Sequence, residues 1–116
     1  MPSSTSYRFG DIVLVPFPFT NQTKSKRRPA IIVNSDAYSR ARKDLILISL
    51  TSQLSQKTRF GVAALQQWKE AGLPVPCFIK PVLFTFEKRL VVRSLGHLRE
   101  KDCSTLREIL DEILGK

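Results

Sequence analysis

Two apolar runs separated by a short cationic loop place the strongest constraint on the fold of this chain. Ile12–Phe17 reads IVLVPF and Ala30–Val33 reads AIIV, both rich in residues that favour strands. The segment between them, Thr20–Arg28, is polar and holds four cations within five residues, and Pro29 follows it. The pattern therefore predicts two buried strands flanking a basic loop, with Arg28 held extended by the proline after it.

Further apolar runs extend this strand pattern along the chain. We expect strands at Asp11–Phe17, Ala30–Asn34, Leu45–Leu50, Phe60–Ala64, Cys77–Phe86 and Leu90–Leu95. Pro81 lies inside one of these runs, which indicates a sheet edge or a bulge because proline cannot donate a ladder hydrogen bond. Leu65–Ala71 is expected to form a helical turn that ends at Gly72.

The last segment has the pattern of an amphipathic helix. From Glu100 to Leu114 apolar residues recur at spacings of three and four, and Gly115 follows. Several short strands followed by one helix predict a mainly β protein, a small SH3-like antiparallel β-barrel with a C-terminal α-helix. We expect a flexible tail over residues 1–6 and a single domain over residues 7–116.

The charge balance points toward a polyanionic partner. The 116 residues include 19 Lys and Arg against 10 Asp and Glu, a net charge of +9, which is typical of nucleic-acid binders. A solvated charge face is the alternative, but the clustering of cations in one loop favours nucleic acid. No apolar run approaches the roughly 20 residues of a membrane span, and the first residues lack a signal-peptide pattern. We therefore expect a cytoplasmic protein without membrane contact.

The histidine and cysteine content argues against a metal centre. His97 is the only histidine, and neither Cys77 nor Cys103 belongs to a CxxC pair, so zinc lacks ligands at its usual spacing. Acidic clusters suited to magnesium are missing from the sequence as well. We expect two reduced thiols, no cofactor and a metal-independent chemistry.

Thr51 stands where the third apolar run gives way to polar residues. A hydroxyl at a strand end is well placed to donate to a bound anion, because the strand holds it rigidly. The alternative is a threonine that caps a turn through its own neighbouring backbone. Position alone leaves both interpretations open.

Three motifs, in this order and spacing, resemble the MazF/PemK family of toxin endoribonucleases. They are Gly10-Asp11, Arg28-Pro29 and Leu50-Thr51-Ser52-Gln53, and the resemblance runs from Arg8 through the terminal helix. It implies a CcdB/MazF-type barrel. It also implies that Arg28 and Thr51 match the family's catalytic Arg and Thr. One departure is Leu83, which stands where many members carry a basic residue.

The resemblance implies a type II toxin that cleaves single-stranded mRNA sequence-specifically and without the ribosome. The 2′-OH of RNA would attack the adjacent phosphorus and leave a 2′,3′-cyclic phosphate and a 5′-OH. Arg28 would bind two non-bridging oxygens and Thr51 would donate a third hydrogen bond. Because a guanidinium stays protonated in proteins, Arg28 is expected to stabilise charge and not to act as a base.

Eight further residues are candidates for RNA contact. The expected phosphate contacts are Lys24, Lys26, Arg27, Lys57 and Arg59; Gln53 is a candidate for a base edge, and Phe17 and Phe19 for stacking. The structural alternatives are solvated cations, a turn residue and core aromatics. The resemblance also implies a homodimer, an acidic antitoxin that competes for the cationic groove, and operator DNA bound by the toxin–antitoxin complex.

Two functions of other classes fit the same sequence. A CcdB-like toxin would poison DNA gyrase by binding and would cut nothing, and a non-catalytic nucleic-acid-binding barrel would need only the basic charge. The Arg28-Pro29 and Leu50–Gln53 motifs favour the endoribonuclease, since neither rival requires them.

Overall fold

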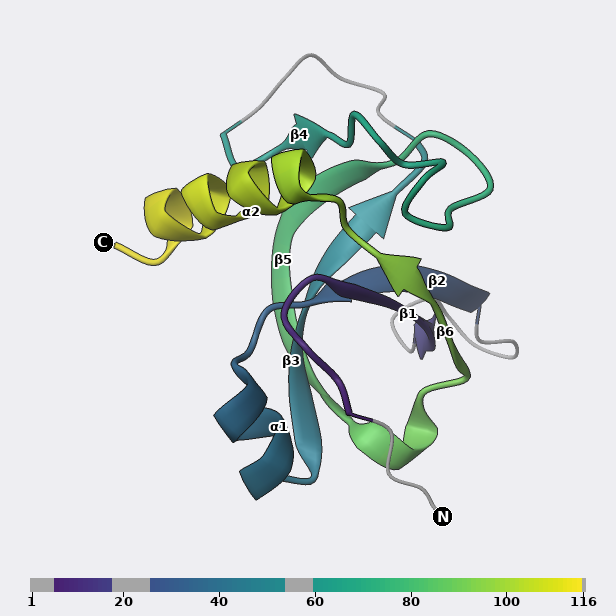
Figure 1. Ribbon diagram of the computed structural model, residues 1–116, viewed down its shortest axis with the longest axis vertical. Helices are drawn as coiled ribbons and strands as arrows, with labels where there is room; N and C mark the ends of the chain where they lie inside the picture. Colours follow the sequence, from purple (N-terminus) through teal and green to yellow (C-terminus); the bar gives the residue numbers. More distant parts are fainter. Residues whose placement is uncertain (1–5, 18–25, 54–59, 116) are drawn as a thin grey trace.

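The computed structural model describes residues 6–17, 26–53 and 60–115. They form one curled antiparallel sheet of order β4-β5-β3-β2-β1-β6, with helix α2 packed across one face (Figure 1). The elements are β1 (Asp11–Phe17), β2 (Lys26–Ile32), α1 (Asp36–Ala41), β3 (Asp44–Thr51), β4 (Ala63–Ala64), β5 (Phe78–Glu87), the 3₁₀ helix η1 (Lys88–Leu90), β6 (Arg93–His97) and α2 (Glu100–Ile113). The predicted mainly β barrel with a C-terminal helix is confirmed.

The six predicted strands are all present, with shifted ends. β2 begins at Lys26, four residues before its predicted start, because Phe17 pairs with Lys26 and extends the ladder into the basic segment. β4 is only two residues long, and β6 begins at Arg93 because η1 occupies the start of the predicted run. The expected tail over residues 1–6 lies outside the described residues except for Ser6.

Helix α1 was not predicted. Ser35 begins it as N-cap, its hydroxyl accepting from the Tyr38 N–H at 3.1 Å. The helix is short and buries only Ser39, so it has no apolar periodicity by which a sequence pattern could find it. The available signal was the serine before an acidic first turn.

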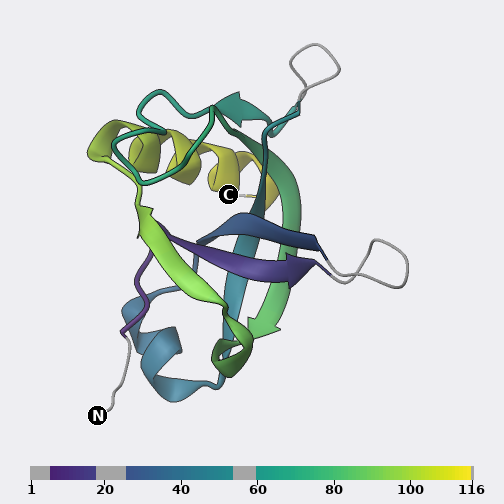
Figure 2. The same ribbon diagram turned by 90° about the vertical axis from the view of Figure 1, so that its right-hand side faces the viewer.

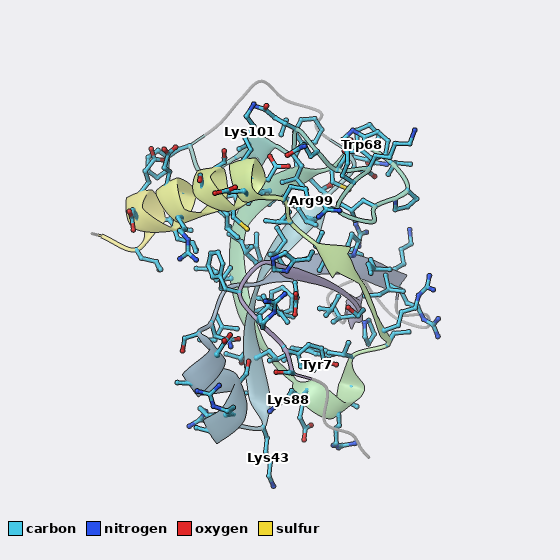
Figure 3. The ribbon with its side chains drawn as sticks, in the orientation of Figure 1. Tyr7, Lys43, Trp68, Lys88, Arg99 and Lys101 are labelled. Atoms are coloured by element: carbon cyan, nitrogen blue, oxygen red, sulfur yellow. The ribbon has the colours of Figure 1, made fainter. Side chains whose placement is uncertain are left out.

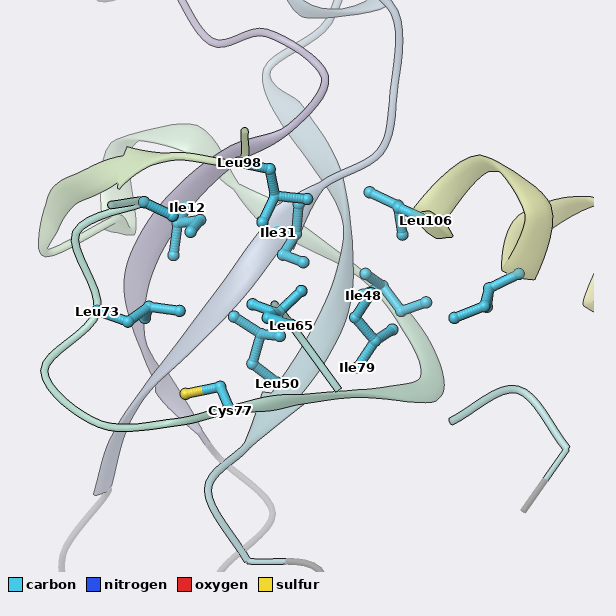
Figure 4. Packing of buried hydrophobic residues seen from close by; sticks show 12 residues of the cluster. Ile12, Ile31, Ile48, Leu50, Leu65, Leu73, Cys77, Ile79, Leu98 and Leu106 are labelled. Carbon is cyan, nitrogen blue, oxygen red and sulfur yellow. The ribbon is translucent and has the colours of Figure 1, made fainter. Parts of the chain in front are cut away.

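The two faces of the sheet bury different apolar clusters. Ile12, Ile31 and Ile48 pack with Leu106 of α2 in the larger cluster (Figure 4), whereas Val13 and its neighbours form a second cluster on the opposite face. Consecutive residues of β1 enter different clusters because strand side chains alternate between faces. Both faces are therefore covered, and these strands read as continuous apolar runs.

β5 bends sharply at the predicted irregularity (Figure 2). Its register with β3 shifts between the pairs Ile48–Leu83 and Leu50–Ile79, and Pro81 lies in the extra segment. The bulge predicted from Pro81 is thus confirmed. Leu83 is half-buried and packs against the larger cluster, so the residue at this departure from the family pattern serves the core.

Helix α2 matches its predicted range to within one residue. Leu106 and Ile109 are buried and form its core-facing stripe. In the described part of the chain, no helix is both long and apolar enough to cross a membrane.

Candidate active site

A groove of about 630 Å³ opens where β2 and β3 diverge at one end of the sheet. Strands β1, β2, β3 and β6, with residues 52 and 53 after β3, supply one part of its lining, and the segment of residues 72–77 supplies the other. Its lining comprises Leu14, Lys26, Arg27, Arg28, Pro29, Leu50, Thr51, Ser52, Gln53, Gly72, Leu73, Pro74, Val75, Cys77, Arg93 and Leu95.

The two candidate catalytic residues meet in this groove. The β2–β3 ladder pairs Ile32 with Leu47 and ends at Ala30 with Ser49. Arg28 and Thr51 each lie two residues beyond this last pair, and both line the groove. The Nε of Arg28 is buried while the residue is partly exposed, so its stem is fixed in the protein.

Of the two interpretations that the sequence left open for Thr51, the structure shows the turn cap, and the residue also lines the groove. Its hydroxyl oxygen accepts from the Gln53 N–H at 3.1 Å, and its proton points to the Gln53 carbonyl at 3.2 Å. This is the turn-capping arrangement. The bond from the Gln53 N–H fixes the oxygen at the groove wall and leaves the hydroxyl proton as the group that a ligand oxygen can redirect.

Three exposed cations line the groove around these residues. Lys26 and Arg27 come from β2 and Arg93 comes from β6. Arg93 of β6 pairs with Leu14 of β1, and Leu14 pairs on its other side with Pro29 of β2. This pairing brings Arg93 into line with Pro29, the residue next to Arg28. Within the described residues none of the three forms an ion pair.

Arg93 was missed from the sequence. The available signal was a cation within an otherwise apolar predicted strand. That signal could not assign Arg93 to the groove, because only the antiparallel pairing of β6 with β1 brings it there.

The side formed by residues 72–77 is apolar. Leu73 and Cys77 are buried, whereas Pro74 and Val75 are exposed to the groove. Burial raises the pKa of the Cys77 thiol, which keeps it protonated and unsuited to nucleophilic attack. Among the described residues of the lining there is no carboxylate and no histidine, and its polar side chains are cations, the hydroxyls of Thr51 and Ser52 and the Gln53 amide.

The remaining sequence candidates separate into three groups. Lys26, Arg27 and Gln53 line the groove, and their contact with RNA stays a prediction. Phe17 ends β1, and its side chain is not described. The others, Phe19, Lys24, Lys57 and Arg59, lie outside the described residues.

His97 is not among the residues that line the groove. Its Nδ1 is 2.6 Å from Oδ1 of Asp11, across the β1–β6 pair. Among the described residues, no cluster of three or more His, Cys, Asp or Glu is placed to hold a metal ion.

Fold and groove together define a small toxin-like barrel with a cationic cleft at one end of its sheet. The chain belongs to the family described as PemK-like, MazF-like toxins of type II toxin–antitoxin systems, whose family model matches residues 8–114. No curated protein sequence matches the chain.

Solved structures of this family share the fold. MazF from Deinococcus radiodurans is 20% identical, with a TM-score of 0.75 over 97% of this chain and 100% of that one. A MazE–MazF complex from the same organism is 18% identical, with a TM-score of 0.76 over 97% and 98% of the two chains. A mycobacterial endoribonuclease bound to its cognate antitoxin is 16% identical, with a TM-score of 0.75 over 97% and 96%.

Proposed function

We propose that this toxin is an endoribonuclease whose active site is the groove. It cleaves single-stranded mRNA in the cytoplasm at specific sequences, without the ribosome and without a metal ion. The observation that carries the proposal is that Arg28 and Thr51, each two residues beyond the last β2–β3 pair, line one groove together with several cations. The similar mycobacterial structures described as endoribonucleases support it.

The substrate supplies the nucleophile in this mechanism. The 2′-oxygen of ribose bonds to the adjacent phosphorus, the bond from phosphorus to the 5′-oxygen breaks, and the products are a 2′,3′-cyclic phosphate and a 5′-OH. The 2′-oxygen loses its proton and the 5′-oxygen gains one, both exchanged with water. The protein contributes orientation and charge stabilisation.

Arg28 and Thr51 stabilise the charge that develops on the phosphate. The guanidinium fork binds two non-bridging oxygens, and the Thr51 proton turns from the Gln53 carbonyl to a phosphate oxygen. Each donor of this kind is worth about 3–4 kcal/mol of transition-state stabilisation. Lys26, Arg27 and Arg93 hold the flanking phosphates, which positions the strand without selecting its sequence.

The proposal includes two protein partners. A homodimer would double the net charge from +9 to +18, and an acidic antitoxin would compete with RNA for the cationic groove. The Deinococcus radiodurans and mycobacterial structures solved with antitoxins support that second partner. Bound operator DNA is expected only of the complex. Sedimentation of the free toxin at twice the monomer mass of 13.2 kDa supports the dimer, and a single species at 13.2 kDa contradicts it.

An RNA incubation in EDTA tests the proposed activity against its rivals. The toxin is expected to cut RNA in the chelator, and an oligonucleotide with deoxyribose only at the cut nucleotide is expected to bind but stay intact. Loss of cleavage in EDTA, or cleavage of the deoxy substrate, overturns the mechanism. Gyrase inhibition without RNA cleavage would instead identify a poison, and binding alone a non-catalytic module.

A further inference from the structure

A buried carboxylate fixes the apolar side of the groove from a distance. Asp102, in the first turn of α2, is only 1% exposed. Its Oδ1 accepts from the Gln66 N–H and its Oδ2 from the Gln67 N–H, both at 2.9 Å. Burying a charge is costly unless it is hydrogen-bonded, and these two charge-assisted bonds satisfy both oxygens. Asp102 therefore anchors the segment that leads into the groove.

Backbone hydrogen bonds in the turn after Gln67 connect the residues that Asp102 holds to the segment that lines the groove. The Ala71 N–H donates to the Gln67 carbonyl at 3.1 Å, and the Leu73 N–H donates to the Trp68 carbonyl at 3.0 Å. These bonds make residues 66–73 one closed backbone unit. Its position relative to the core is set where Asp102 holds its first residues.

Two glycines let this unit rest directly on strand β6. A Cβ added to Gly72, whose φ is +100°, would lie 2.2 Å from the Leu95 carbonyl oxygen. One added to Gly96 would lie 1.9 Å from the Ala71 carbonyl oxygen. The backbones of residues 71–72 and of β6 are therefore in direct contact, with no room for a side chain between them. This contact fixes where the segment of residues 72–77 begins relative to the sheet.

The far end of the segment is clamped as well. The Leu65 N–H donates to the Cys77 carbonyl at 3.0 Å and closes the loop at its base. The side chains of Leu73 and Cys77 point into the core (Figure 4). Pro74 and Val75, the latter 45% exposed, are left on the groove surface.

The groove therefore presents two unlike sides to a nucleic-acid strand. One carries cations that suit phosphates, and the other carries the small apolar surface of Pro74 and Val75, which suits the face of a base. We propose, resting on the function proposed above, that Pro74 and Val75 form a nucleobase subsite and that Asp102 is the positioning residue that sets its distance from Arg28. The base that packs there belongs to a nucleotide beside the cut phosphate.

The decisive variant changes only the acceptor character of Asp102. Asp102→Asn keeps the size of the side chain but turns an N–H₂ toward one of the two backbone donors, so that the turn shifts. Since misplacement of about 1 Å can cost up to about a hundredfold in rate, we expect KM for RNA to rise by about tenfold. Selectivity at one nucleotide beside the cut should also relax. The matched control is Glu108→Gln, the same change at an exposed position of α2, which should behave as wild type.

A second variant tests the subsite without touching the buried carboxylate. Val75→Ala removes exposed apolar surface and should raise KM by about threefold, the size expected when about 25 Å² of apolar contact with the base is lost at about 25 cal/mol per Å². Val92→Ala is its control, because Val92 is similarly exposed and lies outside the groove lining.

Steady-state kinetics, 5′-end sequencing of RNA fragments and hydrogen exchange at Gln66 and Gln67 provide the readouts. Faster exchange with raised KM and altered cut sites supports the proposal. A merely structural role of Asp102 would lower stability and the active fraction, leaving the KM and cut sites of both variants at wild-type values, and that result overturns the proposal. If wild-type toxin cuts no RNA, the proposed function fails first, and the subsite fails with it.

Discussion

The two ends of strand β3 are both rich in cations but use them in opposite ways. Thr51 ends the strand in the groove, and Asp44 begins it roughly 23 Å away, as expected for eight extended residues. Lys43 and Lys88 mark this far end of the molecule, well away from Trp68 near the groove side (Figure 3).

At the far end, Arg42, Lys88 and Arg89 are paired with groups of the protein itself, whereas Arg40 and Lys43 form no ion pair within the described residues. The Nε of Arg42 lies 3.0 Å from Asp44 Oδ1, and the Nε of Arg89 lies 3.1 Å from Glu87 Oε2. The Lys88 ammonium donates to the Ser39 carbonyl. These contacts fasten α1 and η1 to the ends of β3 and β5.

At the groove end, Lys26, Arg27 and Arg93 form no ion pair within the described residues. The difference lies in the acids, since none lines the groove, whereas Asp44 and Glu87 stand among the far cations. A groove cation that lacks an internal acid stays available to an anion bound in the groove, whereas Arg40 and Lys43 lie outside the groove lining. The net charge of the chain therefore says less about function than the placement of its few carboxylates.

The largest expected effect is the loss of RNA cleavage when Arg28 or Thr51 is substituted, with Arg42 at the far end as the control. Arg28→Ala and Thr51→Ala should each reduce cleavage by at least about a hundredfold, because each removes a donor to the developing charge. Arg28→Lys should fail too, since an ammonium cannot reproduce the bidentate fork. Arg42→Ala, at the far end, should leave cleavage unchanged. RNA cleavage assays with circular dichroism check this, and a folded Arg28 variant that cuts normally would refute its role.

Salt dependence should show the next largest difference between the two ends. Each neutralised phosphate contributes about −0.7 to the slope of log K against log salt, so about four engaged cations give a slope near −3. The double variant Lys26→Gln, Arg93→Gln should flatten the slope by about 1.4 and weaken all sequences alike. The pair Arg40→Gln, Lys43→Gln removes the same charge at the far end and should change neither slope nor preference.

Fluorescence titrations of single-stranded RNA between about 50 and 200 mM salt provide the measurement. Equal flattening by both double variants would show that RNA binding follows total charge, and the contrast between the two ends would then be wrong.

The smallest effect concerns stability at the far end. Hydrogen bonds from Arg42 and then from the Tyr38 hydroxyl lower the pKa of Asp44 below its usual value. Because its folded-state pKa is lowered, Asp44 contributes stability above its unfolded-state pKa and loses that contribution as the pH falls through the folded value. Asp44→Asn should therefore destabilise the protein slightly at neutral pH and much less at acid pH.

Urea unfolding at neutral pH and near pH 2 measures that difference. RNA affinity of Asp44→Asn should equal that of the wild type, since Asp44 lies outside the groove. A variant whose stability deficit grows toward acid pH would contradict the assigned pairing.

Local chemistry determined much of the fold. Apolar runs predicted all six strands, Pro81 predicted the bulge in β5, and the spacing of Leu106 and Ile109 predicted α2, because each is a property of neighbouring residues. α1 was not predicted because tertiary contacts hold it in place, such as the hydrogen bond from the Tyr38 hydroxyl to Asp44.

The sequence by itself placed Arg28 just before a strand and Thr51 at the end of one, and the structure includes Arg28 in β2, which begins at Lys26. Only the tertiary structure decided that the two line one groove, that Arg93 joins them, and that Asp102 holds another part of its lining from 35 residues along the chain. The reason is physical. Strand and helix patterns arise from the spacing of residues within one segment, whereas a groove is set by register between segments, which depends on how each buries its apolar face against the others.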